Sequence, residues 1–332
     1  MHHRDLKLFA PNAGRAYGEA VSRALGQPLA AHEEREFEDG EHKARSLENV
    51  RGCDVFVVQS LYGDAERSAD DKLLRLLFLV GALKDASAAR VTVVAPYLAY
   101  SRKDQKSKAR DPVTTRYVAT LFEAVGADCI VTLDVHNLAA YQNAFRCRAE
   151  HLEAGPLFVR TLAPRLRDAD PVVVSPDAGG IKRADAFRTR LAAALGRPVG
   201  MAFAEKYRSG GELRGDALVG DVDGKVAVVI DDLISAGNTI ARAAHACRER
   251  GAARVIACAS HGVFAEDANA VLADAAVDEI VVTDSILPWR LTDARVLAKV
   301  RQVGTAPLVA GAIRRMHGGD SLSEFVERAG DS

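Results

Sequence analysis

Residues 228–240 read Val-Val-Ile-Asp-Asp-Leu-Ile-Ser-Ala-Gly-Asn-Thr-Ile. The pattern predicts an apolar strand that ends in two acids, Asp231 and Asp232, followed by a loop of small residues and a helix that begins around Thr239. Ligands of open α/β sheets bind beyond the carboxyl ends of the strands, and the N–H groups at the start of a helix attract phosphate. This segment therefore predicts an α/β fold with a phosphate site at one strand end.

The two acids allow more than one interpretation. Their carboxylates could accept hydrogen bonds from sugar hydroxyls, or they could hold a hydrated Mg²⁺ ion. Acids at a strand-to-helix turn also serve as purely structural helix caps. The order of the whole segment, with a strand, two acids and a small-residue loop, favours a ligand site over a simple cap.

Short runs of β-branched residues alternate with longer helical patterns along the chain. Strands are predicted at residues 54–59, 91–95, 130–133, 172–175, 226–230, 255–257 and 279–282, and helices near residues 71–86, 114–125, 180–195 and 239–250. The strands are apolar on both faces, which favours an α/β fold with mainly parallel sheets covered by helices on both sides.

The joins between helices and strands repeat. Gly126 and Gly251 each follow a helix and precede a strand, in the place of a left-handed helix end. Any α/β protein can reuse such a join, and two related domains in tandem would also produce it. Because a polar, proline-containing stretch follows residue 150, we expect two domains, residues 1–150 and 151–332. The last helical segment, residues 307–325, is expected to pack back on the first domain.

Composition limits the classes of partner. The 332 residues carry 44 Lys and Arg against 45 Asp and Glu, a formal charge of −1, whereas nucleic-acid binders usually have a basic excess. No apolar run approaches the ~20 residues of a membrane span, and the first residues lack a signal-peptide core. The five cysteines include no Cys-x-x-Cys pair. We therefore expect a cytoplasmic protein with no nucleic-acid or membrane partner.

Two further strand ends carry side chains that suit phosphate or metal chemistry. Residues 175–180 place Asp177 before small residues that open a helix, and Asp134 and His136 follow another strand. Carboxylate and imidazole groups are ligands for divalent metals. The structural alternatives are an ordinary Asp turn at Asp177 and a satisfied Asp–His pair at Asp134 and His136.

The segment at 228–240 resembles the phosphoribosyl-pyrophosphate-binding signature of type I phosphoribosyltransferases and ribose-phosphate pyrophosphokinases. Further segments resemble pyrophosphokinase motifs in the same order, at residues 37–41, 49–52, 96–104, 133–136 and 175–180. The resemblance runs from about residue 6 to about residue 325, and a phosphoribosyltransferase would lack the first half. It implies two tandem type I phosphoribosyltransferase-like α/β domains, the first contributing ATP and the second ribose 5-phosphate.

The resemblance also implies an activity. The β,γ-pyrophosphoryl group of Mg-ATP would pass to O1 of ribose 5-phosphate, giving AMP and 5-phosphoribosyl 1-pyrophosphate for nucleotide biosynthesis. His136 and Asp177 match residues that contact Mg²⁺. The residues that match the ribose 5-phosphate and pyrophosphate site are Asp177, Gly179, Gly180, Asp231, Asp232, Ser235, Ala236, Gly237, Asn238 and Thr239. Within that set, the acid pair would bind ribose hydroxyls and the last five residues the 5-phosphate.

The first half would supply the ATP site. The matching residues are Phe37, Asp39, Glu41, Arg102, Lys103, Asp104 and His136. The first three match residues that hold the adenine of a neighbouring subunit's ATP, which implies a homo-oligomer, either a dimer or a hexamer. Lys206 and Arg208 match the cations of a flexible catalytic loop that stabilise the transferring group. On sequence alone, these segments could equally be solvated surface loops.

Several positions depart from the family pattern. Ala236 stands where bacterial members commonly have Thr, and Asn238 stands where they have Gly; Asn tolerates left-handed backbone better than most residues. Lys103 replaces Gln, and Arg75 replaces Glu. These departures leave two alternatives beside the synthase: a catalytically silent regulatory paralogue, or pyrophosphoryl transfer to a different sugar phosphate.

Overall fold

A computed structural model describes residues 5–209, 212–265, 267–274, 276–322 and 325, with backbone only for the described residues between 205 and 217. The chain divides into two compact units. Unit 1 joins the residues up to Glu153 with a segment that begins at Ala306, and unit 2 covers Ala154–Thr305. We propose that these units are the two domains expected from the sequence.

Unit 1 is built on a five-stranded sheet in the order β1-β4-β5-β6-β7. All neighbouring strands in it are parallel. The central strands are runs of apolar, mostly β-branched residues that are buried along their length, as expected when helices cover both faces. The strands are β1 (Leu6–Phe9), β4 (Asp54–Val58), β5 (Arg90–Val94), β6 (Cys129–Leu133) and β7 (Arg148–Leu152).

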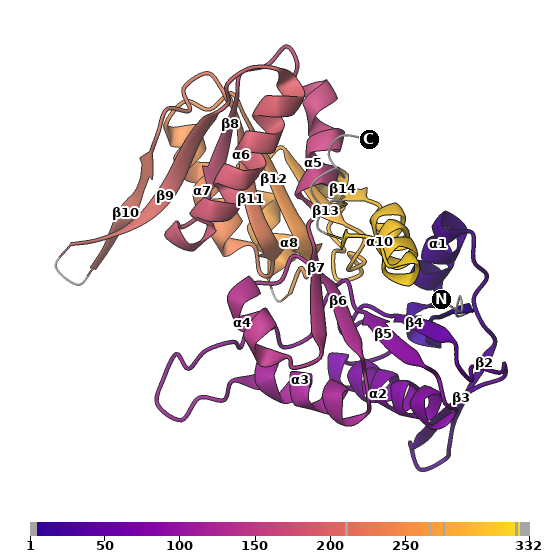
Figure 1. The fold of residues 1–332 in the computed structure, drawn as a ribbon. Helices are drawn as coiled ribbons and strands as arrows, with labels where there is room; N and C mark the ends of the chain where they lie inside the picture. Colours follow the sequence, from indigo (N-terminus) through magenta and orange to yellow (C-terminus); the bar gives the residue numbers. More distant parts are fainter. Residues whose placement is uncertain (1–4, 210–211, 266, 275, 323–324, 326–332) are drawn as a thin grey trace. The chain divides into compact units, whose positions relative to one another are not determined.

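Helices from both ends of the chain cover this sheet (Figure 1). One face packs against α2 (Ala69–Asp85), α3 (Thr114–Ala124) and α4 (Leu138–Ala144), which share a buried apolar cluster with the strands. On the other side, α1 (Arg15–Leu25) packs against α10 (Ala306–Gly318). Two contacts hold α10: His317 Nδ1 lies 2.8 Å from Asp54 Oδ2, and Arg90, which also pairs with Asp54, donates to the carbonyl of Met316 at 3.0 Å.

A separate hairpin packs on α2. It consists of β2 (His32–Glu36) and β3 (His42–Ser46). Glu36 accepts from Arg75 at 2.8 Å and from Arg67 at 2.8 Å, and both arginines also bind Asp71. The departure at Arg75 thus has a structural role, because its guanidinium ties the hairpin to α2.

Unit 2 contains a seven-stranded sheet in the order β10-β9-β8-β11-β12-β13-β14. Its neighbouring strands are parallel except β10, which runs antiparallel to β9. The strands are β8 (Pro171–Ser175), β9 (Gly200–Ser209), β10 (Glu212–Val219), β11 (Val226–Ile234), β12 (Arg254–Gly262), β13 (Glu279–Thr283) and β14 (Val300–Val303).

The helices of unit 2 lie on both faces of this sheet (Figure 1). The face that carries Val229 and Ala257 packs against α7 (Asn238–Glu249) and α8 (Ala268–Asp274). The other face carries α6 (Ile181–Leu195), which contacts β8, β9 and β11. The remaining helices are α5 (Gly155–Leu162) and α9 (Ala294–Lys299), with short 3-10 turns at Ala163–Arg165 and Ala178–Gly180.

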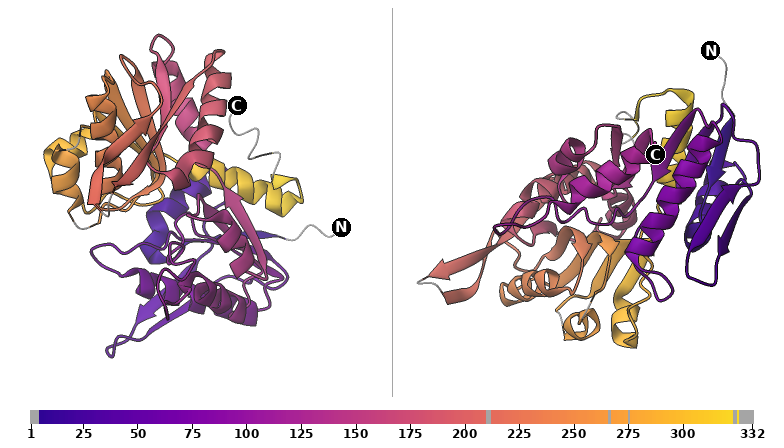
Figure 2. Two further views of the ribbon diagram at one scale, coloured as in Figure 1. Left: turned by 90° about the vertical axis from the view of Figure 1, so that its left-hand side faces the viewer. Right: turned by 90° about the horizontal axis from the view of Figure 1, so that it is seen from below.

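Strands β9 and β10 form a ribbon that continues past the end of β8 (Figure 1 and the right-hand view of Figure 2). Ser175 at the end of β8 pairs with Phe203, so the six residues from Ala204 to Ser209 extend beyond it. At about 3.3 Å per residue, this extension spans about 20 Å.

Candidate functional site

Asp231 and Asp232 lie near the carboxyl end of β11 and share one cationic partner. Nη1 of Arg183, on the first turn of α6, lies 3.0 Å from Asp231 Oδ1 and 3.3 Å from Asp232 Oδ1. The side chains of Asp231 and Asp232 are only 17% and 5% exposed, so both charges are largely removed from water. A single guanidinium nitrogen therefore bridges two nearly buried carboxylates.

This arrangement changes the acidity of Asp231. Burial first, and then hydrogen bonding and repulsion by Asp232, together raise the pKa of Asp231 from 3.8 to about 7. Arg183 and the backbone N–H of Asp232, which donates to Asp231 Oδ1 at 2.8 Å, act in the opposite direction. The cause is the one expected for two neighbouring carboxylates in a poorly solvated place.

The loop after the acid pair leads directly into α7. Gly237 is its left-handed residue, with a φ of 90°, and it caps α7 without a side chain. Asn238 is the first residue of α7 and is exposed. Ser235 and Ala236 are half-buried. Because Gly237 offers no side-chain acceptor, the N–H groups of the first turn of α7 face the loop ready for an anion.

A second loop of this kind follows β8. Asp177 Oδ1 accepts from the N–H of Gly180 at 3.0 Å, and Ser175 Oγ donates to the carbonyl of Asp177 at 2.7 Å. A Cβ on Gly180 would lie 2.8 Å from Ser175 Oγ, which explains the need for glycine there, and Gly179 lies against the same carboxylate. These bonds fix the conformation of the turn that leads into α6.

The two loops lie at one edge of the sheet. Strands β8 and β11 are parallel neighbours, with Val174 opposite Val229. Their carboxyl ends therefore bring Asp177, Gly179 and Gly180 beside the acid pair and the loop that ends at Thr239. The structure brings the predicted ribose 5-phosphate residues together within unit 2.

Lys206 and Arg208 lie on the extension of β9. Lys206 pairs with Asp216 and Arg208 with Leu213 in β10, in a ribbon with a register irregularity between these pairs. The side chains of both residues lie outside the described part of the structure. Their backbone positions are three and five residues past Phe203, at the same carboxyl edge as the two loops.

In unit 1, two predicted segments follow neighbouring parallel strands. His136 comes after β6 and is exposed; Asn137 next to it accepts from the N–H of Ala140 at 3.1 Å and caps α4. Arg102, Lys103 and Asp104 come after β5. Since β5 and β6 are paired, both segments lie at the carboxyl edge of this sheet.

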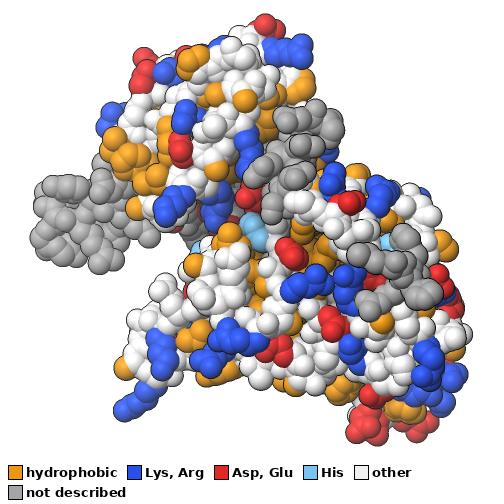
Figure 3. Space-filling model, viewed as in Figure 1, with side chains coloured by type: hydrophobic (Ala, Val, Ile, Leu, Met, Phe, Trp, Pro, Cys, Tyr) orange, Lys and Arg blue, Asp and Glu red, His pale blue; other side chains and the backbone are white. Residues whose placement is uncertain are grey.

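The basic loop after β5 is held by an acid that sequence reasoning did not single out. Asp111 Oδ2 accepts from Lys103 Nζ at 2.8 Å and from the N–H groups of Lys108 and Ser107 at 3.0 and 3.2 Å. These bonds lower the pKa of Asp111, and the bond from Lys103 has the largest effect. Lys and Arg side chains gather on the surface of this loop (Figure 3). Lys103 therefore has an intramolecular partner where the family has Gln.

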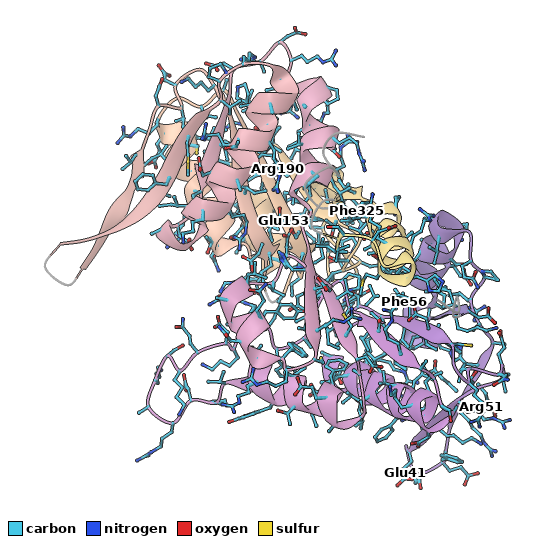
Figure 4. The ribbon with its side chains drawn as sticks, in the orientation of Figure 1. Glu41, Arg51, Phe56, Glu153, Arg190 and Phe325 are labelled. Atoms are coloured by element: carbon cyan, nitrogen blue, oxygen red, sulfur yellow. The ribbon has the colours of Figure 1, made fainter. Side chains whose placement is uncertain are left out.

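The predicted adenine residues lie elsewhere in unit 1. Phe37, Asp39 and Glu41 form the tip of the β2–β3 hairpin, where the Phe37 ring is 39% exposed and lies 5.3 Å from the Arg35 guanidinium. Glu41, labelled in Figure 4, marks the far end of unit 1 from the loop that follows β5. The structure therefore does not bring these three residues together with Arg102–Asp104 in one unit.

Arg183 is the site residue that sequence reasoning missed. The available signal was a cation three residues after Gly180, on the first turn of a helix that starts at the same sheet edge as the acids. Over the described residues, no three His, Cys, Asp or Glu side chains gather as a metal site, and no helix there has the length and apolar character to cross a membrane.

Comparisons with known proteins agree with this geometry. Residues 6–126 match the family profile for the N-terminal domain of ribose phosphate pyrophosphokinase, and residues 214–327 match the phosphoribosyl synthetase-associated domain. A ribose-phosphate pyrophosphokinase of Caldanaerobacter subterraneus subsp. tengcongensis is 38% identical over 322 residues, which cover 97% of this chain and 98% of the relative. The protein of the same name from Granulibacter bethesdensis is 39% identical over 323 residues, covering 97% and 100%.

A solved structure is also similar over nearly the whole chain. The crystal structure of phosphoribosylpyrophosphate synthetase from Mycobacterium smegmatis matches with a TM-score of 0.84 at 35% identity, covering 95% of this chain and 100% of that one. This match confirms the predicted fold class of parallel α/β sheets flanked by helices. Together with the two matched domains and the full-length relatives, it shows that this chain belongs to the ribose-phosphate pyrophosphokinase family.

Proposed function

We propose that this protein is an active ribose-phosphate diphosphokinase that makes 5-phosphoribosyl 1-pyrophosphate for nucleotide biosynthesis. One observation carries the proposal: two small-residue loops that open helices flank a pair of carboxylates at one edge of the unit 2 sheet. Such an edge offers an acceptor pair for two sugar hydroxyls between two cradles for phosphate groups. The substrate that combines these features is a sugar phosphate that gains a pyrophosphate.

Each loop has its own part in binding the sugar. The loop of Ser235, Ala236, Gly237, Asn238 and Thr239 would bind the 5-phosphate through the backbone N–H groups at the start of α7. Asp231 and Asp232 would accept from the ribose hydroxyls. The turn of Asp177, Gly179 and Gly180 would receive the pyrophosphate on O1. Ala236 lacks the hydroxyl common at this position, so backbone groups would provide most of the phosphate contacts.

The residues present fit a Mg²⁺ ion held mainly by phosphate oxygens. Mg²⁺ usually keeps several waters and takes one or two carboxylates together with substrate phosphates, so it needs no cluster of three protein ligands. Asp177 offers a carboxylate whose Oδ1 is already oriented by Gly180. With His136, it would contact the ion, which when bound neutralises charge on the phosphates.

The reaction would proceed by direct displacement. O1 of ribose 5-phosphate forms a bond to the β-phosphorus of ATP, the bond from that phosphorus to the oxygen of AMP breaks, and the O1 proton is lost. Phosphoryl-type transfers depend chiefly on positioning and charge stabilisation. We assign the charge stabilisation to Lys206 and Arg208, whose backbone lies past the carboxyl edge where the sugar would bind.

ATP would bind through Arg102, Lys103, Asp104 and His136 at the carboxyl edge of unit 1. Phe37, Asp39 and Glu41 lie far from this edge within one copy, which favours a homo-oligomer in which a neighbour's hairpin completes the adenine site. We place the enzyme in the cytoplasm, because all five cysteines are free thiols, as expected in a reducing compartment.

The test is to mix the purified protein with ATP, Mg²⁺ and ribose 5-phosphate and to follow AMP and 5-phosphoribosyl 1-pyrophosphate by chromatography. We expect both products in equal amounts, and only when the sugar is present. Lys206→Ala should lower kcat by about 10³, with KM for both substrates changed little, because a transition-state cation is lost. Lys225→Ala is the matched control: Lys225 pairs with Asp221 at the opposite end of β11 and should leave kcat unchanged.

Absence of both products from the folded wild-type protein would refute the proposal. A Lys206→Ala variant with nearly wild-type kcat would remove Lys206 from the mechanism while leaving the overall activity in place.

A further inference from the structure

The contact between Arg183 and the two acids is not accounted for by the substrate roles assigned above. Arg183 is the third residue of α6, and its side chain is 30% exposed. It reaches from α6 to β11, two elements that pack against each other although Arg183 and Asp231 lie 48 residues apart in the chain. Its Nη1 alone makes both close approaches, at 3.0 Å and 3.3 Å.

Two adjacent, poorly solvated carboxylates need such a cation if both are to accept hydrogen bonds from one ligand. At the low exposure of Asp231 and Asp232, their mutual repulsion favours turning one side chain away or protonating one of them. Either change would remove an acceptor from a site that must take two hydroxyl groups. A cation placed between the nearest oxygens opposes both changes.

We propose that Arg183 is a positioning residue that holds Asp231 and Asp232 side by side as paired acceptors, and that it thereby sets selectivity for a sugar phosphate with two vicinal hydroxyls. This inference deepens the proposed function and rests on it. Arg183 acts through the two acids, so its effect should fall on sugar binding and on discrimination between sugars rather than on ATP.

The chain offers matched variants for the test. Arg183→Gln removes the cation and keeps a side chain of similar polarity. Arg183→Lys restores one cationic nitrogen, which suffices here because Nη1 makes both contacts. Arg188→Gln is the control: Arg188 lies on the same helix and forms an exposed pair with Asp185 at 2.7 Å.

We expect Arg183→Gln to raise KM for ribose 5-phosphate about tenfold to a hundredfold, the range for loss of a charged hydrogen bond, with KM for ATP within about twofold. The preference for ribose 5-phosphate over 2-deoxyribose 5-phosphate, which lacks one of the two hydroxyls, should shrink in the same variant. Arg183→Lys should recover most of both losses, and Arg188→Gln should match the wild type in both.

Calorimetric binding of the two sugars to the full-length protein separates this inference from the proposed activity. If the wild type binds ribose 5-phosphate but forms no AMP, the activity fails, and the affinity of Arg183→Gln still decides the role of Arg183. A folded Arg183→Gln variant with wild-type affinity and wild-type preference between the sugars would overturn the inference. So would a wild type that does not bind ribose 5-phosphate.

Discussion

The left-handed backbone at Gly237 allows a quantitative prediction about the phosphate loop. Gly237 has a φ of 90°, and a Cβ added there would lie 2.8 Å from Cδ2 and 3.0 Å from Cγ of Leu272, a fully buried residue of α8. Left-handed backbone costs a residue with a Cβ about 1–2 kcal/mol. Overpacking a filled core adds about 1–3 kcal/mol. Gly237→Ala should therefore lower the free energy of unfolding by about 2–5 kcal/mol.

Gly196→Ala is the matched control. Gly196 ends α6 with a φ of 66°, and nothing lies within 4 Å of its added Cβ. It carries the backbone cost without the clash, so about 1–2 kcal/mol should be lost. The difference between the two variants isolates the contact with Leu272. The single tryptophan, Trp289, belongs to unit 2 with both glycines, so its fluorescence during urea unfolding is the appropriate signal.

The two variants should also differ in function. A shifted Leu272 or a displaced loop moves the N–H groups at the start of α7, and small misplacements of binding groups are costly. We expect KM for ribose 5-phosphate to rise on the order of tenfold or more in Gly237→Ala and to stay unchanged in Gly196→Ala. Equal stability losses in the two variants, together with an unchanged KM, would refute the proposed link between loop packing and phosphate binding.

Two further predictions concern charged groups. KM for ribose 5-phosphate should rise as the pH falls below about 7, because the raised pKa of Asp231 lets its carboxylate take up a proton there and lose an acceptor. Asp231→Asn should lose most of this dependence, and equal KM at pH 6 and pH 8 in the wild type would contradict the prediction. Asp54→Asn should lower the free energy of unfolding, measured by urea unfolding, by about 3 kcal/mol. The reason is that Arg90 would keep its charge but lose its buried partner, which also binds His317. A loss below about 1 kcal/mol would show that the Arg90 guanidinium is solvated instead.

Sequence reasoning located the features that depend on local order along the chain. The strand runs, the acids near the carboxyl end of β11 and the turn at Asp177 were all predicted, because burial and turn chemistry depend on neighbouring residues. The structure adds a detail that the sequence analysis did not predict: Gly237 has the positive φ, and Asn238 already belongs to α7.

Contacts between distant segments could not be predicted in this way. Arg183 is 48 residues from Asp231, and Arg75 is 39 residues from Glu36. Nothing in the residues around either arginine identifies its partner, since any exposed acid is compatible with a helix cation. Only the packing of α6 on β11, and of the hairpin on α2, selects one acid among many. The roles assigned to the site residues stay predictions until the variants above are measured.

The position of α10 has a consequence for the order in which the protein folds during synthesis. All the described strands of unit 2 lie between Ala154 and Thr305, so they are available once Thr305 has left the ribosome. Unit 1 is not continuous, because its first helix packs against α10 and Arg314 donates to the carbonyls of Ala24 and Leu25. The half of the protein that is made first is therefore completed last, and a nascent chain that stops before residue 306 lacks the helix that packs against α1 on one side of its first sheet.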